Sequence, residues 1–301
     1  MYLYHFGLRR LPFGLTPDTA FYVELPGHRA ALNVLHVALE SGEGFVKVTG
    51  EVGTGKTLLC RKLLAELERP DTVCAYLPNP YLEPHALRLA LAHELAIKVA
   101  PDAAEATLAR QLELRLMALA EQGRRVVFVI DEAQALPDAS LEALRLLSNL
   151  ETERRKLVQI VLLGQPELDA RLRTTAFRQL RQRIAFAVAL PALRPAQLRA
   201  YLEHRLRAAG HADGRLFSGP AASLLGRLAR GIPRLAHVLA HKALMLAYGR
   251  GLARAGWRQV WDAARDTEDV ALYLRRLVLP WFLGGLGLVS AGAALAARAW
   301  W

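Results

Sequence analysis

The chain has 301 residues, of which 39 are Lys or Arg and 28 are Asp or Glu, giving a formal net charge of +11. This length allows one large or two modest domains with a sizeable core. Cys60 and Cys74 lie in apolar stretches, which excludes a disulfide framework and predicts buried free thiols in a reducing compartment. Residues 1–10 contain no apolar run, so no signal peptide is expected.

The positive charge comes almost entirely from arginine, because only six of the 39 basic residues are lysine. Together with abundant Ala and Leu, this preference is consistent with a coding bias. A basic balance still permits nucleic acid or anionic lipid as a partner.

In chain order, residues 1–28 are predicted to form an N-terminal apron, and residues 29–191 an α/β core. Within this core, apolar runs typical of buried strands alternate with helical patterns. Strands are expected at 44–49, 73–77, 126–130, 157–163 and 184–190, and helices at 28–41, 57–64, 84–99, 104–122 and 138–152. This alternation predicts a parallel sheet covered by helices on both faces.

After Pro191 the pattern becomes all-helical, which predicts a second small domain, a helical lid over residues 192–268. Helices are expected at 195–209, 219–230, 233–249 and 256–266. His237 and His241 are spaced i,i+4 on one of these helices. Neither has an evident carboxylate or thiol partner, so both are expected to be structural rather than metal ligands.

The stretch from Gly50 to Thr57 fits the phosphate-binding pattern G-x-x-x-x-G-K-[ST] at every fixed position, between a strand and a helix. Its glycines let successive backbone N–H groups face phosphate oxygens. Lys56 can reach the β- and γ-phosphates, and the Thr57 hydroxyl can ligate Mg²⁺. The predicted nucleotide-binding residues of the loop are Gly50, Glu51, Val52, Gly53, Thr54, Gly55, Lys56 and Thr57.

Asp131 and Glu132 follow a predicted buried strand, at the edge where open α/β sheets place their ligands. We expect Asp131 to hold Mg²⁺ and Glu132 to activate the attacking water as a general base. Gln165 ends the next strand, where a polar side chain can sit between the γ-phosphate and that water. The plainer alternatives are an acidic helix cap and a polar turn residue.

Arginines at two places are candidates for transition-state stabilisation. Arg178, Arg181 and Arg183 precede the last strand, and one of them could reach the γ-phosphate of a neighbouring subunit. Arg181 and Arg183 are preferred, without a choice between them. Arg234 follows Gly231-Ile232-Pro233 at a helix start and could couple phosphate state to the lid. The alternative for the first three is a solvated basic face, and for Arg234 it is a surface arginine in the first turn of a helix.

These residues together resemble the ExeA/GspA-type AAA+ ATPases of bacterial secretion and type IV pilus systems. Within that family, the stretch from Arg234 to Gly249 is most similar to the MshM branch, named for MSHA pilus biogenesis. The similarity covers about residues 2–265 and rests on the opening Phe13–Asp18, the phosphate loop, Asp131-Glu132, Leu163–Leu168, Leu180–Ile184 and Gly231–Leu235.

The resemblance implies an ATP- and Mg²⁺-dependent hydrolase with a five-stranded parallel core and a helical lid. It implies a homo-oligomer, with a hexamer as one arrangement, in which Arg181 or Arg183 acts as an arginine finger in trans. Gln165 would be sensor one and Arg234 sensor two. ExeA-type proteins continue into a periplasmic peptidoglycan-binding region, which this sequence does not show, so cell-wall binding is not expected.

Residues 277–297 form a run of 21 residues without charge. At ~1.5 Å per residue a helix of this length spans about one bilayer core. Arg275 and Arg276 precede the run and predict that the large domain lies in the cytoplasm. We therefore expect a single C-terminal transmembrane helix in the bacterial inner membrane. The alternative is a buried helical hairpin in the lid.

The favoured hypothesis is a membrane-tethered ATPase that helps to assemble a type IV (MSHA-like) pilus or a type II secretion apparatus, with proteins of that apparatus as partners. The alternative is a DNA-directed AAA+ ATPase of the transposition-accessory type, which the basic charge would suit. No helix-turn-helix or zinc motif is apparent, so nucleic acid is the less favoured partner. A non-hydrolysing scaffold is opposed by the Asp131-Glu132 pair.

Overall fold

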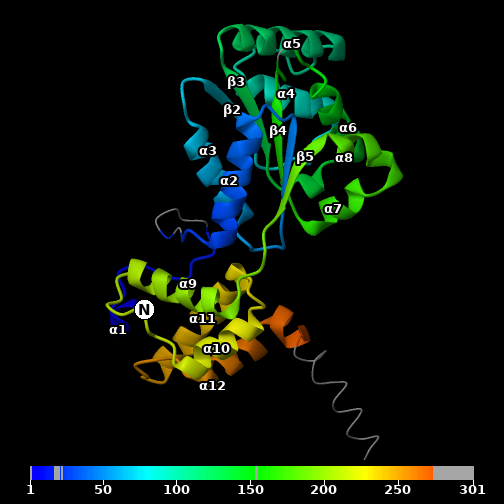
Figure 1. The fold of residues 1–301 in the computed structure, drawn as a ribbon. Coiled ribbons are helices and arrows are strands. Elements are labelled where there is room, and N and C mark those ends of the chain that lie inside the picture. The colour runs from blue at the N-terminus through cyan, green and yellow to red at the C-terminus, as the bar shows by residue number, and fades with distance from the viewer. Residues whose placement is uncertain (1, 17–20, 22, 153–154, 274–301) are drawn as a thin grey trace, which may run out of the picture. The chain divides into compact units, whose positions relative to one another are not determined.

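The structure is a computed structural model that describes residues 2–16, 21, 23–152 and 155–273. It divides into two compact units. One contains residues 16–192, and the other combines residues 1–15 with residues 193–301 (Figure 1). The N-terminal segment 1–15 therefore belongs to the same unit as the C-terminal helices, at the opposite end of the sequence.

The unit of residues 16–192 is built on a five-stranded sheet in the order β2-β3-β4-β1-β5. All four neighbouring pairs are parallel. The strands are β1 (Phe45–Thr49), β2 (Thr72–Leu77), β3 (Arg125–Ile130), β4 (Gln159–Gly164) and β5 (Ile184–Ala189). The predicted five-stranded parallel core is confirmed, and with it the α/β fold class.

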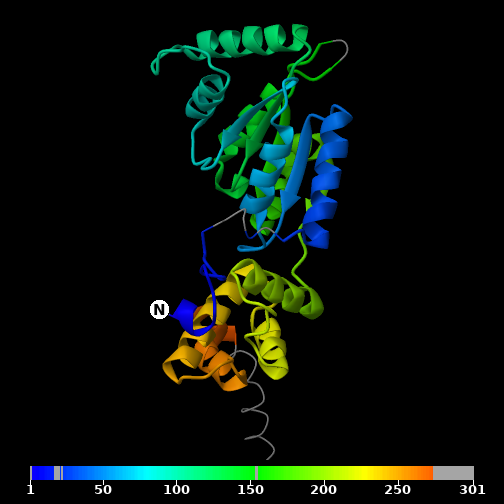
Figure 2. The same cartoon turned by 90° about the vertical axis from the view of Figure 1, so that its left-hand side faces the viewer.

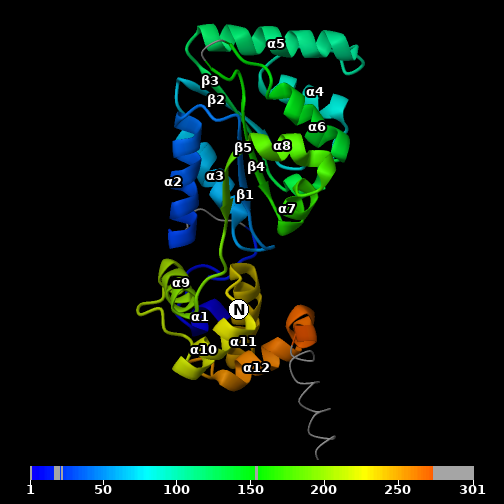
Figure 3. The same cartoon turned by 45° about the vertical axis from the view of Figure 1, so that its right-hand side comes forward.

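Helices cover both faces of this sheet, as Figures 1 and 3 show. One face packs against α2 (Pro26–Glu40) and α3 (Lys56–Leu67). The other face packs against α4 (Pro84–Glu94), α5 (Glu105–Glu121), α6 (Asp138–Leu147), α7 (Pro166–Leu172) and α8 (Arg178–Arg183). The continuous apolar runs of the sequence are explained by this double burial.

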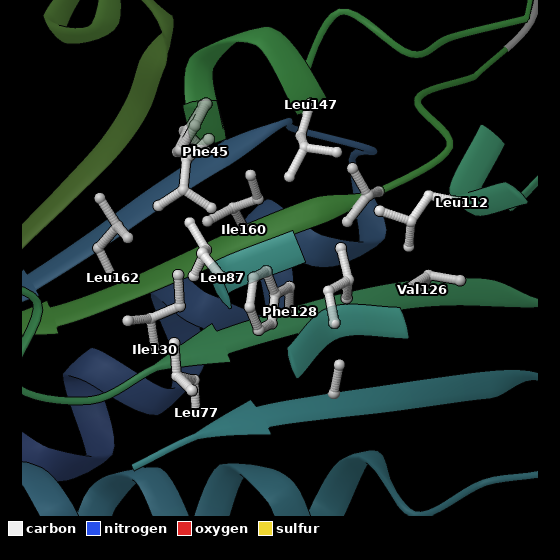
Figure 4. Packing of buried hydrophobic residues seen from close by; sticks show 14 of the residues in the cluster. Phe45, Leu77, Leu87, Leu112, Val126, Phe128, Ile130, Leu147, Ile160 and Leu162 are labelled. Atoms are coloured by element: carbon white, nitrogen blue, oxygen red, sulfur yellow. The ribbon is translucent and has the colours of Figure 1, made fainter. Parts of the chain in front are cut away.

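Strand β3 shows how one strand serves two cores, because successive side chains of a strand point to opposite faces. Phe128 and Ile130 enter the core shared with α4 to α8, which Figure 4 shows from close by. Val127 and Val129 enter the core shared with α2 and α3. All four side chains are fully buried, and each contributes about 1.5–3 kcal/mol of hydrophobic stabilisation.

Two helices end earlier than the sequence pattern predicts. The helix expected over 84–99 ends at Glu94, because Ala96 adopts a left-handed φ of 55°. The helix expected over 138–152 ends at Leu147, where the Ser148 hydroxyl donates to the Arg145 carbonyl at 2.7 Å. Apolar periodicity continues past both ends, so the pattern alone could not locate them.

The cysteine prediction is largely confirmed. Both thiols are free, with Cys60 fully buried on α3 and Cys74 partly buried on β2. Burial raises the pKa of Cys60 to about 12 and that of Cys74 to about 11. Neither thiol is therefore a reactive thiolate at neutral pH.

The unit of residues 1–15 and 193–301 is helical in the part that the structure describes. Its main elements are α9 (Pro195–Ala208), α10 (Gly219–Leu228), α11 (Pro233–Gly249) and α12 (Trp257–Arg265). These match the predicted helices closely because proline or glycine stands at or beside most of their ends. Proline at the first or second position begins α9, α10 and α11, as it does α2, α4 and α7, where a missing N–H costs nothing.

The N-terminal segment is fastened to these helices by hydrogen bonds. Its short helix α1 (Tyr2–His5) packs on α11 (Figure 2). The Tyr2 hydroxyl lies 2.9 Å from His241 Nδ1. Further along, the Pro12 carbonyl accepts a hydrogen bond from Arg205 Nε at 2.6 Å. The Gly14 carbonyl lies 3.1 Å from His237 Nδ1. The first 15 residues are thus an integral part of this unit.

Gly231 allows the start of α11 to approach the chain that enters this unit. Its φ is 72°, and a Cβ placed there would lie 2.2 Å from the Leu193 carbonyl oxygen. The Leu193 N–H donates to the Gly231 carbonyl at 2.8 Å. A side chain at position 231 would therefore break this contact.

The predicted transmembrane helix at 277–297 lies outside the described residues. Among the residues that the structure does describe, no helix is long and apolar enough to cross a membrane.

His237 allows a test of the packing in the helical unit. Burial and the nearby Arg205 lower the pKa of His237 to about 3. The unfolded chain binds this proton near the ordinary value, so the contribution of His237 to stability is complete above pH ~6.5. It is lost as the pH falls below that value, by up to about 1.4 kcal/mol per pH unit.

We expect His237→Gln to flatten the decline of stability between pH 6.5 and pH 5, because glutamine can still bond Tyr201 but binds no proton. Urea unfolding followed by tryptophan fluorescence measures this, since all five tryptophans lie in residues 193–301. An equal decline in the two proteins would contradict the assignment.

Candidate nucleotide-binding site

The phosphate loop connects β1, which ends at Thr49, to α3, which begins at Lys56. Gly53 and Gly55 have φ values of 82° and 97°, which a residue with a side chain rarely adopts. Gly50 is needed for a different reason. A Cβ there would lie 2.9 Å from Thr54 Oγ1 and 3.0 Å from Leu190 Cβ. The loop thus has the open, curled backbone that the pattern predicted.

Lys56 is 5% exposed and folds back over the loop. Its Nζ donates to the Gly50 carbonyl at 2.7 Å and to the Glu51 carbonyl at 3.1 Å. Burial lowers the pKa of Lys56, while the charges of Glu132 and Asp131 act against that shift. The ammonium group is therefore held at the loop, where phosphate oxygens can replace the two carbonyls as acceptors.

His28, on α2, contacts the backbone of the phosphate loop, and sequence reasoning did not select it. It is 6% exposed, and its Nε2 lies 2.9 Å from the Thr54 carbonyl oxygen. Burial lowers the pKa of His28, which favours a neutral ring that donates to this carbonyl. A Cβ at Gly55 would lie 3.0 Å from its ring. Twenty-six residues separate His28 from Thr54, and no motif links them.

Asp131 lies at the end of β3, 2% exposed, opposite the start of α3. Its carboxylate accepts hydrogen bonds from the Thr57 side chain and from the Glu132 backbone N–H, the latter at 2.9 Å. Burial raises the pKa of Asp131 in spite of these bonds. A hydroxyl beside a carboxylate is the oxygen donor set that Mg²⁺ prefers, so the residues fit this ion.

Glu132 follows Asp131 with a left-handed φ of 50°. This turn directs its carboxylate to two amide groups. Its Oε2 accepts from Gln134 Nε2 at 2.6 Å and from Gln165 Nε2 at 3.1 Å. Burial favours the protonated acid, but these hydrogen bonds and the charge of Lys56 outweigh it and lower the pKa of Glu132. The group is therefore a carboxylate at neutral pH, as a general base must be.

Gln134 is a site residue that sequence reasoning did not select. Besides donating to Glu132, its Oε1 accepts from the Gln165 backbone N–H at 2.9 Å. Its own carbonyl accepts from Arg171 at 2.7 Å. The Gln134 side chain thus joins Glu132, the second residue after β3, to Gln165, the first residue after β4. The sequence signal was an amide two residues beyond the acidic pair, which in isolation resembles any polar turn residue.

Helix α7 is also fastened to strand β1. Asp169 accepts from Lys47 Nζ, and its other oxygen accepts from Thr49 Oγ1 at 2.9 Å. Lys47 and Thr49 lie on β1, and Thr49 immediately precedes the phosphate loop. Gln165 caps the same helix α7. The contact therefore fixes the spacing between the loop and Gln165.

The candidate arginines have different surroundings. Arg183 is half-buried, and its Nη1 lies 2.8 Å from Ser148 Oγ and 3.4 Å from the Arg145 carbonyl. Arg181 is exposed, with a 3.3 Å contact to the Arg173 carbonyl. Arg178 is exposed as well. Arg234 lies in the helical unit, exposed near the start of α11, so its role towards the nucleotide stays a prediction.

The parallel sheet and the glycine-rich loop are those of a P-loop nucleotide-binding domain. Residues 39–172 match the model of the AAA domain family, so the chain contains an AAA domain. That range begins on α2 and ends on α7, and it includes the phosphate loop and all three residues of the Glu132 network.

Over its whole length the chain is 38% identical to general secretion pathway protein A of Aeromonas hydrophila. The match covers 100% of this chain and 54% of that relative, so the chain spans about half the length of the relative. This finding confirms the resemblance to the ExeA/GspA-type AAA+ ATPases. The finer similarity to the MshM branch stays a prediction.

Solved structures share the fold at low identity. Cdc6p of Pyrobaculum aerophilum superposes with a TM-score of 0.62 at 19% identity, over 83% of this chain and 71% of that chain. The Aeropyrum pernix ORC1 protein in complex with DNA superposes with a TM-score of 0.63 at 22% identity, over 85% of this chain and 69% of that chain. The RuvB Holliday junction branch migration motor of Thermotoga maritima superposes with a TM-score of 0.55 at 17% identity, over 85% of this chain and 73% of that chain.

Gln134→Ala should slow ATP turnover, because Glu132 then loses its shortest hydrogen bond and the Gln165 backbone N–H loses its side-chain acceptor. A hydrogen bond to a charged group stabilises by about 1.5–3 kcal/mol, which corresponds to roughly a 10- to 100-fold lower kcat. The pKa of Glu132 should rise, so the acidic limb of the pH–rate profile should move to higher pH. Phosphate release measured over a pH series tests both effects. An unshifted acidic limb would mean that Gln134 does not tune Glu132.

Proposed function

We propose that this protein binds ATP with Mg²⁺ at the Gly50–Thr57 loop and hydrolyses it, and that it uses this cycle in a bacterial envelope assembly machine. The observation that supports hydrolysis best is the state of the Glu132 carboxylate. Its Oε2 takes both amide donors, and within the described residues its Oε1 has no hydrogen-bond partner. One oxygen is thus anchored while the other is free to accept a proton from water.

In the proposed reaction, loop N–H groups and Lys56 bind the β- and γ-phosphates and neutralise their charge. Thr57 and Asp131 would hold Mg²⁺, which supplies electrostatic stabilisation of the transferring phosphoryl group. Glu132 orients the attacking water and accepts its proton. Gln165, which donates to Glu132, is the residue that can also sense the γ-phosphate, as its position at the end of β4 predicted.

We propose Arg181 as the arginine finger that acts on a neighbouring subunit of a homo-oligomer. Arg183 is the weaker candidate because Ser148 and the Arg145 carbonyl already hold its guanidinium group. Arg181 is exposed on the short helix α8 and has one long backbone contact. An arginine that breaks few hydrogen bonds within its own subunit loses less free energy when it reaches a partner's γ-phosphate. Arg234 is proposed as sensor two, following the resemblance.

The cellular role is proposed from the similarity to general secretion pathway protein A. By this analogy, the protein serves a type II secretion apparatus, and a type IV pilus of the MSHA kind is the alternative machine that the MshM similarity favours. Residues 277–297 are proposed to anchor the chain in the inner membrane, with the ATPase unit in the cytoplasm. Because the relative is about twice as long, this role is a proposal for the shared half.

Glu132→Gln tests hydrolysis and partners together. We expect this variant to bind ATP with unchanged affinity but to turn it over at least about 100-fold more slowly, because it lacks the general base. Lys56→Ala should instead lose nucleotide binding. Calorimetric titration and phosphate release distinguish the two variants, and unchanged turnover in Glu132→Gln would remove Glu132 as the base.

The same variant, held in its ATP state, is suited to capture partners from detergent-solubilised membranes of the source bacterium. Recovery of secretion or pilus proteins with Glu132→Gln, and their loss with Lys56→Ala, is the expected outcome. Recovery of DNA with a recombinase instead would favour the DNA-directed class and overturn the envelope role, while leaving hydrolysis in place.

Mixing experiments test the finger in trans. Arg181→Gln keeps the nucleotide site but lacks the finger, whereas Lys56→Ala keeps the finger but lacks the site. Each alone should be nearly inactive, and a mixture should regain part of the ATPase activity because complementary subunits meet in one oligomer. Arg178→Gln and Arg183→Gln are the matched controls. If the mixture stays inactive while Arg183→Gln and Lys56→Ala complement each other, Arg183 is the finger.

A further inference from the structure

The net charge of the chain is divided very unequally between its two units. Residues 16–192 contain 21 basic and 22 acidic residues, a net charge of −1. Residues 1–15 and 193–301 contain 18 basic and 6 acidic residues, a net charge of +12. The ATPase unit is therefore nearly neutral, and the helical unit is the part that an anionic partner would attract.

On the helical unit, helix α12 presents two exposed tryptophans. Trp257 is 51% exposed and Trp261 is 37% exposed. They are four residues apart and therefore neighbours on one face of the helix. Val260, Ala263 and Ala264 lie on the adjoining side of the helix and are fully buried in the unit, so the tryptophans stand at the edge of its buried face. Two partly exposed indoles side by side form an apolar patch that the described part of the unit leaves uncovered.

Unneutralised arginines surround these tryptophans. Arg258 lies over the Trp257 ring, with its Cζ 5.5 Å from the centroid. Arg265 follows Trp261 by four residues and is exposed. Neither forms an ion pair within the described residues. Asp262, the acidic residue of α12, pairs with Arg250 at 2.9 Å, and Asp266, directly after the helix, pairs with Lys242 at 2.8 Å.

We propose that this face of α12, formed by Trp257, Arg258, Trp261 and Arg265, docks on the surface of an anionic lipid bilayer. Indole rings prefer the interface between headgroups and acyl chains, where the ring is apolar and the N–H stays wet. Arginines next to them pair with lipid phosphates, and each one raises the membrane-binding constant about fivefold. Exposed Glu268 and Asp269 follow the face and oppose docking, so the net attraction rests on the arginines.

A bilayer suits this face better than nucleic acid or a second copy of the chain. The two indoles lie beside isolated cations on one short helix, whereas a nucleic-acid surface needs a longer track of cations along the backbone. The same face of a second copy would bring the same positive charge and be repelled. The inference rests on the membrane localisation proposed above and adds that the helical unit itself touches the bilayer.

The test uses the full chain with Trp281→Phe, Trp300→Phe and Trp301→Phe, so that Trp257 and Trp261 are the remaining fluorophores. It is reconstituted in vesicles of phosphatidylcholine alone or with phosphatidylglycerol. Docking predicts blue-shifted emission, and quenching by brominated lipid, in the anionic vesicles but not in the neutral ones. Both effects should weaken at high salt. Arg258→Gln with Arg265→Gln should abolish most of the shift, whereas Arg69→Gln with Arg173→Gln, an equal charge change in the other unit, should not.

Co-sedimentation with neutral vesicles reports the predicted span at 277–297 separately. If the chain co-sediments but the emission is the same in both vesicle types, the anchor stands and the docking proposal is wrong. A shift that depends on the protein-to-lipid ratio in neutral vesicles would assign the face to a second copy. A shift that appears on adding duplex DNA to neutral vesicles would assign it to nucleic acid. Either result overturns the proposal.

Discussion

The site depends on one carboxylate oxygen and the two amides that hold it. Glu132 Oε2 is bonded to Gln134 and Gln165, and Gln134 is bonded in turn to the Gln165 backbone. A carboxylate on a loop would otherwise rotate freely and lose side-chain entropy on binding water. The amides remove this freedom before nucleotide arrives and keep the pKa low. They also leave Oε1 free to accept a proton from water. A salt bridge that engaged both carboxylate oxygens would not.

The parallel sheet makes this arrangement possible. Strands β1, β3 and β4 are neighbours that run in the same direction, so the phosphate loop, Asp131-Glu132 and Gln165 all emerge at one edge. The hydrogen bonds of Asp169 with Lys47 and Thr49 then fix α7 against β1. Catalytic spacing is therefore set by rigid strands and one partly buried polar contact rather than by the loops themselves.

The two units have separate physical roles. The ATPase unit holds the nucleotide chemistry and is close to neutral, whereas the helical unit contains the excess positive charge and the exposed tryptophans. In the helical unit the first 15 residues are fastened by buried polar groups, with Arg205 bonded to Pro12 and His237 placed between Tyr201 and Gly14. A buried neutral histidine is tolerated there because both of its nitrogens have partners.

The sequence by itself determined the parts that depend on neighbouring residues. Residues Gly50 to Thr57 predicted the loop because its glycines, lysine and threonine act through local backbone geometry. Apolar runs predicted the strands because burial on both faces leaves a local pattern. Prolines predicted helix starts. The order of these motifs was sufficient for the resemblance to ExeA/GspA-type ATPases.

Tertiary structure decided what depends on residues far apart in the chain. His28 meets Thr54, Asp169 meets Lys47, and Gln134 meets Gln165, although no spacing in the sequence relates these pairs. Helix ends at Ala96 and Ser148 were set by single backbone angles and caps that periodicity does not record. The exposure of Trp257 and Trp261 was decided in the same way, because a helical pattern marks an apolar residue as a core candidate until the neighbouring helices show which face they cover.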